Sequence, residues 1–129
     1  MPAGVSYLYK GTEEFNERAV RALETVSDVI VWGREKGLDD PKAQLNKVIE
    51  EVGEAAHEIT RNHYDLDALE QPDELVDALG DILVTVIILA DIFNLDPFTC
   101  LEEARDTILK RHGHTEDGTF IKDEENNGN

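Results

Sequence analysis

Six acidic residues in two short segments stand at spacings that suit the binding of a divalent cation. Both segments show the three-and-four residue periodicity of a helix, so acids three, four or seven positions apart fall on one face. The six acids are Glu50, Glu51, Glu54, Glu74, Asp77 and Asp81. Carboxylate oxygens are the ligands that Mg²⁺ and Mn²⁺ prefer, so the pattern predicts a site for a hard cation and for the phosphates that such an ion binds.

The later acids precede one of the most apolar runs of the chain, "ILVTVIILA" at positions 82–90. On a helix they share one arc with buried-type residues, in the order Glu74, Asp77, Asp81, Val84, Thr85 and Ile88. An unpaired buried carboxylate costs several kcal/mol, and this segment supplies no Lys or Arg to pair with the acids. Either its first two turns extend into water, where the helix dipole favours acids, or a cation binds there.

The earlier acids lie within "KAQLNKVIEEVGEAAHE", opposite an apolar stripe. That stripe consists of Leu45, Val48, Ile49, Val52, Ala56 and Ile59. A Glu-rich face opposite such a stripe is usually solvated, but Glu51 and Glu54, three positions apart, repel each other unless something neutralises them. If the two helices pack side by side, these two glutamates would face the acids of the later helix. We call the four acids of this arrangement the carboxylate box: Glu51, Glu54, Asp77 and Asp81.

Glu54 and His57 also show the Glu-x-x-His spacing of di-iron helical bundles. A di-iron site needs a second copy of that spacing. No acid stands three positions before His63, His112 or His114, so we favour Mg²⁺ or Mn²⁺ over iron.

Four helices are expected to position these acids. Their predicted ranges are Thr12 to about Arg34, Pro41 to about Arg61, Pro72 to about Phe93, and Pro97 to His112 closed by Gly113. Asp-Pro pairs at 40–41 and 96–97 supply a cap and a first helical residue. The run at 82–90 is rich in β-branched residues and could instead form a buried strand, but the unbroken pattern from Asp73 to Asn94 favours a helix. "EDGTFIK" reads as a turn followed by an apolar tether.

The chain of 129 residues suits one domain at 1–122, followed by a disordered acidic tail at 123–129. Twelve basic against 29 acidic residues give a net charge of -17, which disfavours nucleic acid and anionic membranes as partners. The N-terminal segment lacks the pattern of a secretory signal, and the longest apolar run is about half of a membrane span. A cytoplasmic protein is expected, with the single Cys100 as a small buried side chain.

The order and spacing of four blocks resemble the MazG-like branch of the all-α nucleoside triphosphate pyrophosphohydrolases, above all small phage and bacterial members. The blocks are Trp32, "PKAQLNKVIEEVGE", "ELVDALGDILV" and "ILKRHGHTEDGTFIK". The resemblance implies an all-α, four-helix bundle-like fold with a short C-terminal extended tail. It also implies Mg²⁺-dependent cleavage of nucleoside triphosphates between the α- and β-phosphates, in a homodimer or homotetramer. Mn²⁺ is a possible substitute, and dNTPs or non-canonical NTPs are the expected substrates.

The resemblance assigns Glu51, Glu54 and Asp81 as metal ligands. The Glu-x-x-Asp pair of the superfamily, if it ends at Asp81, would begin at Ala78, so we expect Asp77 to replace the missing acid. The alternative register, Glu74 with Asp77, keeps the pair intact but shifts the apolar block by one turn. Glu50 or Glu51 is the candidate for accepting a proton from the attacking water.

Cations and one aromatic residue near these blocks are candidates for contacting the substrate: Lys47, Lys110, Arg111, Lys122 and Trp32. Trp32 could stack on the base or serve as a core or interface residue. The motifs do not encode which base is preferred. Two other classes stay open, a catalytically weak nucleotide or metal sensor with a degenerate site at Ala78, and a structural helical module with solvated acids.

Overall fold

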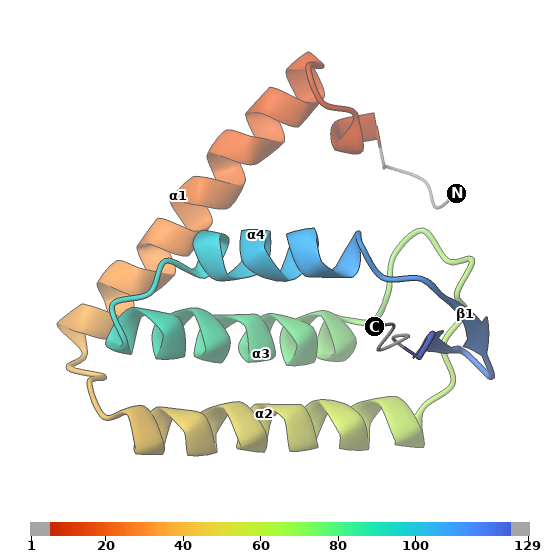
Figure 1. Ribbon diagram of the computed structural model, residues 1–129. Coiled ribbons are helices and arrows are strands. Elements are labelled where there is room, and N and C mark those ends of the chain that lie inside the picture. The colour runs from red at the N-terminus through yellow and green to blue at the C-terminus, as the bar shows by residue number, and fades with distance from the viewer. Residues whose placement is uncertain (1–5, 125–129) are drawn as a thin grey trace. The chain divides into compact units, whose positions relative to one another are not determined.

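The computed structural model describes residues 6–124 of the chain. A short 3₁₀ turn, η1 (Ser6–Leu8), precedes four helices and a β-hairpin (Figure 1). The elements are α1 (Glu13–Glu35), α2 (Pro41–Arg61), α3 (Asp73–Ile92), α4 (Pro97–Ile108), β1 (Gly113–Glu116) and β2 (Thr119–Lys122). The predicted all-α class is confirmed, and the expected extended tail contains an antiparallel two-stranded hairpin. Within residues 6–124, no helix combines the length and apolarity needed to cross a membrane.

The chain divides into two compact units at Asn94. The first unit carries α1, α2 and α3, and the second carries α4 and the hairpin. Asn94 has a positive φ of 57°, and its backbone N–H donates to the Asp91 carbonyl oxygen at 2.9 Å. Asparagine tolerates this left-handed conformation better than most residues, so it ends α3 at the boundary between the units.

Side chains cap three of the helices at the positions that the sequence indicates. Thr12 accepts a hydrogen bond from the Phe15 N–H at 3.2 Å. Asp40 accepts from the Lys42 and Ala43 N–H groups at 2.9 and 3.2 Å. Asp96 caps α4 in the same way, and both Asp-Pro pairs place proline in the first turn, where its missing N–H costs nothing.

The segment at 82–90 is helical, as favoured, and not a strand. The fourth helix ends at Ile108, so the prediction that it reaches His112 is wrong. The cause is non-local, because Gly113 pairs with Lys122 and the Asp123 N–H donates to the His112 carbonyl oxygen at 2.8 Å. The predicted disordered tail begins at this hydrogen-bonded Asp123, and its positions 125–129 lie outside the described residues.

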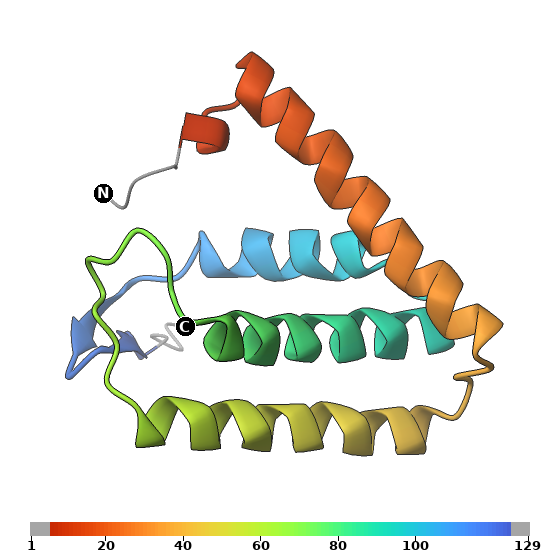
Figure 2. The same ribbon diagram turned by 180° about the vertical axis from the view of Figure 1, so that it is seen from behind.

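Within the first unit, α2 and α3 lie antiparallel and side by side, and the end of α1 meets the end of α3 (Figure 2). Gly33 is buried at the second contact, where a Cβ atom would stand 3.2 Å from Ile88 Cγ1. Next to it, Arg34 forms a two-pronged ion pair with Asp91 at 2.6 and 2.9 Å. These contacts fix how α1 approaches α3.

The buried face of α2 includes only one of its acids. Gln44, Glu51 and Ala55 are buried, whereas the predicted core stripe stays largely open. Its exposed members are Leu45, Ile49, Val52 and Ile59, at 45–61% of their full surface. Most of the apolar stripe of α2 is therefore left uncovered within residues 6–124. An amphipathic pattern shows which face is apolar, but it does not show which surface covers that face.

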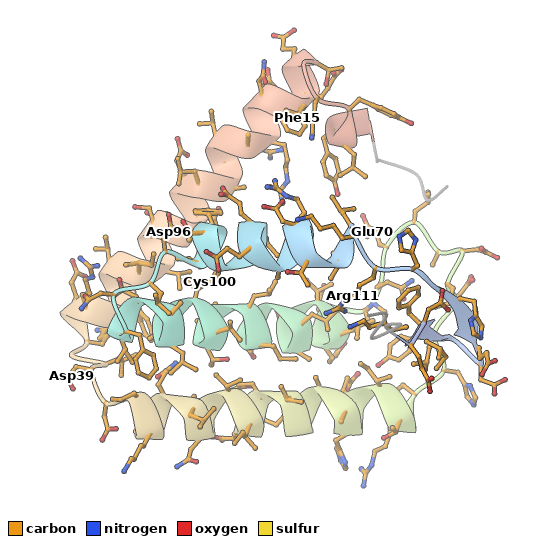
Figure 3. All side chains as sticks on the ribbon, in the orientation of Figure 1. Phe15, Asp39, Glu70, Asp96, Cys100 and Arg111 are labelled. Carbon is orange, nitrogen blue, oxygen red and sulfur yellow. The ribbon has the colours of Figure 1, made fainter. Side chains whose placement is uncertain are left out.

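Cys100 on α4 is exposed, so its predicted burial is also wrong (Figure 3). No residue of α4 is buried.

Candidate active site

A cavity of about 590 Å³ opens in the first unit along the paired helices α2 and α3. Asp39, in the turn between α1 and α2, stands at its border (Figure 3). The apolar lining comes from Trp32, Leu38, Ala43, Val84 and Ile88. The polar and charged lining includes Asp39, Asp40, Gln44, Lys47, Glu51 and Asp81. A mostly apolar hollow with a few convergent polar groups is the usual form of a small-molecule site.

One hydrogen bond shows how the two helices are aligned along this cavity. Gln44 Nε2 on α2 donates to the Thr85 carbonyl oxygen on α3 at 3.2 Å. Because the helices are antiparallel, Glu51 and Asp81 both lie toward the same end from this level. At 1.5 Å per residue they are displaced along the helices by about 10 Å and about 6 Å. We call the end with Lys47, Glu51 and Asp81 the acidic end, and the end with Trp32, Leu38 and Gln44, which Asp39 and Asp40 also line, the apolar end.

Glu51 is 8% exposed and is paired with a lysine. Its Oε1 lies 3.3 Å from Lys47 Nζ, which lies equally close to Glu50 Oε2. The hydrogen bonds to Glu50 and Glu51, in that order, raise the pKa of Lys47. A buried carboxylate needs such a partner. Glu50, in contrast, has a side chain that is 55% exposed and does not line the cavity.

Glu54 is exposed one turn beyond Glu51 and lies outside the cavity lining. A hydrogen bond to Glu51, and then the negative charge of Glu51, raise the pKa of the Glu54 carboxyl. Two carboxyl groups in contact repel each other once both are ionised, and a divalent cation would relieve that repulsion. The donor chemistry of this pair therefore suits Mg²⁺.

The acids of α3 are only partly gathered with those of α2. Asp81 shares the cavity with Glu51, whereas Asp77 is exposed outside it. Among residues 6–124, no three His, Cys, Asp or Glu side chains come close enough together to hold a metal ion. Glu51 lies seven residues after Gln44, and Ala78 lies seven residues before Thr85 on the antiparallel helix. Ala78, the position where the expected acid is missing, therefore lies level with Glu51.

Glu74, the first acid of the alternative register, lies near Tyr64 rather than at the cavity. Burial and a hydrogen bond to Glu58 raise the pKa of Tyr64, and the charge of Glu74 adds to this effect. The structure thus offers no support for the alternative register that begins at Glu74.

The other substrate-binding candidates divide between the two units. Trp32, 47% exposed, lines the first cavity together with Lys47. Lys110, Arg111 and Lys122 line a separate cavity of about 400 Å³ within the second unit, together with His112 and with three acids. Those acids are Asp106, Asp123 and Glu124.

A family model described as the MazG nucleotide pyrophosphohydrolase domain matches residues 39–115, more than half of the chain. The chain belongs to the MazG family. The match confirms the resemblance to MazG-like proteins that the sequence motifs indicated. Nucleotide pyrophosphohydrolysis is the activity that this family supports. The MazG match begins at Asp39 on the border of the cavity and contains all six acids singled out above. No curated protein and no solved structure matches the chain.

Four polar cavity residues of this MazG domain were not predicted from the sequence as site residues: Asp39, Asp40, Gln44 and Thr85. A signal for Gln44 was available. It stands seven positions before Glu51, so the two share one helix face. Asp40 was recognised only as a helix cap, a role that it also has in the structure.

Proposed function

We propose that this MazG chain hydrolyses nucleoside triphosphates between the α- and β-phosphates, with Mg²⁺, or Mn²⁺ in its place, as cofactor. The products are the nucleoside monophosphate and pyrophosphate, and dNTPs or non-canonical NTPs are the expected substrates. The observation that carries the proposal is the single cavity that joins an apolar end beside Trp32 to an acidic end with Glu51 and Asp81. A nucleotide has the same polarity, with an apolar base at one end and phosphates at the other.

Glu51, Glu54 and Asp81 are the residues that would hold the metal, with Asp77 as a further candidate one turn before Asp81. Their all-oxygen donor set and the repulsion between Glu51 and Glu54 support this assignment. When bound, Mg²⁺ would neutralise phosphate charge and make the attacking water more acidic.

The side chains of the cavity have separate tasks in this proposal. Lys47 would contact a phosphate oxygen when the cation takes over its partner Glu51, and the face of Trp32 would support the base. Glu50 or Glu51 accepts the proton of the attacking water. Lys110, Arg111 and Lys122 are further candidates for phosphate contacts.

The test is a panel of canonical and modified NTPs and dNTPs with Mg²⁺ or Mn²⁺, in which pyrophosphate and orthophosphate release are measured separately. We expect the wild type to release pyrophosphate. The variants Glu51→Gln, Glu54→Gln and Asp81→Asn should each lose more than about tenfold in kcat/KM. Glu24→Gln on the exposed surface of α1 is the matched control and should keep full activity. Orthophosphate alone, or losses below tenfold in all three variants, would refute the proposed site.

A second candidate is a catalytically weak nucleotide or metal sensor. It is favoured by Ala78, which stands level with Glu51 where an acid is expected, and by the absence of a three-acid group within residues 6–124. A sensor would bind nucleotide and gain thermal stability by mass action without releasing pyrophosphate. A purely structural module would show neither effect.

The proposed assembly is a homodimer or homotetramer. Exposed apolar side chains form a second stripe, on α3, at Val76, Leu79, Leu83 and Val86, where 45–63% of each is open. Together with the open stripe of α2, this surface is more apolar than a monomer usually exposes. Cytoplasmic location and the lack of nucleic acid and membrane partners remain predictions from composition.

A further inference from the structure

The Gln44 side chain is a buried amide with only half of its hydrogen-bonding groups engaged. It is 6% exposed and lines the cavity in the first unit. Its Nε2 donates to the Thr85 carbonyl oxygen at 3.2 Å. Because a backbone carbonyl can only accept, the amide nitrogen must face Thr85, and the amide oxygen must point elsewhere.

Gln44 Oε1 accepts no hydrogen bond from any residue that the structure describes. Among residues 6–124, Gln71 Oε1 is the one side-chain nitrogen or oxygen atom that is both buried and without a hydrogen-bond partner. Gln44 Oε1 also lacks a partner, so it must keep some open surface. The small open surface of Gln44 therefore belongs to the cavity that it lines. An acceptor that opens to the cavity and has no protein partner is suited to receive a hydrogen bond from a bound molecule in place of water.

The surroundings of Gln44 favour hydrogen-bond donors. Asp40 lines the apolar end of the cavity one turn before Gln44, and its carboxylate accepts hydrogen bonds from the Lys42 and Ala43 N–H groups at the start of α2. Asp39 lines that end as well, and ionised carboxylates only accept. The one cation that lines this cavity, Lys47, is paired with Glu50 and Glu51. A ligand edge rich in N–H groups would be bound here, and an edge rich in carbonyl oxygens would be repelled.

We propose that Gln44 reads the exocyclic amino group of a nucleobase, so that cytosine-type or adenine-type nucleotides are the preferred substrates. This inference rests on the proposed function, which places the base at the apolar end. A 4-amino pyrimidine or 6-amino purine donates N–H to Gln44 Oε1. The matching keto base would set its carbonyl oxygen against Gln44 Oε1 and could pair only through its adjacent ring N–H or with the second N–H of Nε2. The Asp39 and Asp40 carboxylates at this end would oppose the same carbonyl oxygen, so the amino base is favoured.

The experiment compares amino with keto nucleotides, dCTP with dUTP and dATP with dITP, in which the adjacent ring nitrogen also changes from an acceptor to an N–H donor. Each is assayed for kcat/KM of pyrophosphate release and, as its non-hydrolysable α,β-methylene analogue with Mg²⁺, for Kd. We expect the amino member of at least one pair to be favoured by about 10- to 100-fold in both readouts. Purine deoxyriboside triphosphate lacks the amino group but keeps the N1 acceptor of adenine, so it isolates the amino group and should bind more weakly than dATP, a comparison that needs no variant.

Gln44→Met keeps the length of the side chain and removes the acceptor. It should bring the amino-to-keto ratio close to one by weakening the amino member alone. Gln71→Met is the matched control, because Gln71 also donates through Nε2, to the Asp65 carbonyl oxygen at 2.9 Å, and leaves Oε1 unpaired, but lies outside the cavity. The control should keep the wild-type ratio.

The outcomes separate this inference from the proposed function. An amino-to-keto ratio near one in the wild type, or equal losses for both members in Gln44→Met, would overturn the role of Gln44 while pyrophosphate release continued. Amino-selective binding without pyrophosphate release would support the role of Gln44 and refute the hydrolase.

Discussion

At the residue scale, the site is dominated by one buried carboxylate and its neighbours. Glu51 is balanced by Lys47 at 3.3 Å on one side and is in contact with Glu54 on the other. The two neighbours act in opposite directions, because the lysine stabilises the charge of Glu51 and the glutamate opposes it. A cation bound by the two carboxylates would replace the lysine as their counter-charge, and the ammonium group would then be available to a phosphate.

Glu54→Gln should stabilise the metal-free protein at neutral pH. The pKa of Glu54 is raised above its ordinary value of 4.5, so the folded state binds the proton more tightly than the unfolded chain. Stability then falls as the pH rises from about 4.5 through the raised pKa, and the glutamine removes this loss. We expect Tm to rise by about 1–3 °C at pH 7 in EDTA, with the gain shrinking toward pH 4.

The measurement of Tm against pH also supplies a control variant and a result that would contradict the prediction. Glu24→Gln, on an exposed face of α1, should leave Tm within error at every pH. A lower Tm for Glu54→Gln at pH 7 would show that this carboxyl is stabilising, contrary to its contact with Glu51. Mg²⁺ should raise the Tm of the wild type more than that of the variant.

At the element scale, the sequence predicted where the helices begin better than which of their faces are buried. The Asp-Pro pairs encode two helix starts locally, because the cap and the proline act within one turn. The early end of α4 depends on the pairing of Gly113 with Lys122, and the burial of Glu51 depends on which helix lies against α2. The acid types of the site and the shared helix face of Gln44 and Glu51 were therefore present in the sequence, whereas the position of Asp77 outside the cavity was not.

Asp91→Asn should loosen the contact between α1 and α3. The Arg34 guanidinium hydrogen-bonds to Asp91 and lowers the pKa of this carboxyl below its ordinary value of 3.8. The ion pair therefore contributes stability that is present above about pH 4 and lost as the pH falls through the lowered pKa. We expect a Tm lower than that of the wild type by a few degrees at pH 7, with a difference that closes below pH 4.

Asp106→Asn is the comparison for this ion pair. Asp106 lies 3.0 Å from the adjacent Arg105, but both side chains are more than half exposed and join no two elements. Its Tm should barely change, since such surface pairs contribute little. Equal Tm losses in the two variants would show that the contact between α1 and α3 has no special role.

At the scale of the whole molecule, the first unit contains few residues that are fully buried. Among its described residues, 6–94, Ala55 and Ile88 are the buried apolar side chains, each 3% exposed, whereas the open stripes of α2 and α3 carry larger ones. A domain with so thin a core gains stability when a second surface covers those stripes. Self-association would then contribute to the stability of the fold as well as to its assembly.

Leu83→Glu should break that association. Leu83 is 63% exposed in the middle of the α3 stripe, so a charge there would be buried in any interface that covers it. Light scattering after gel filtration should give at least twice the 14.5 kDa chain mass for the wild type and a single chain mass for the variant. Leu66→Glu, at an 89% exposed position outside the stripe, should keep the wild-type mass. A monomeric wild type would contradict the proposed assembly.

The open stripes of α2 and α3 also determine how association should respond to salt. Each copy carries a net charge of -17, so two copies repel each other at long range while their apolar surfaces attract at contact. Added salt screens the repulsion and leaves the apolar attraction in place. The association constant should therefore increase with ionic strength, the reverse of what a complex held by opposite charges would show.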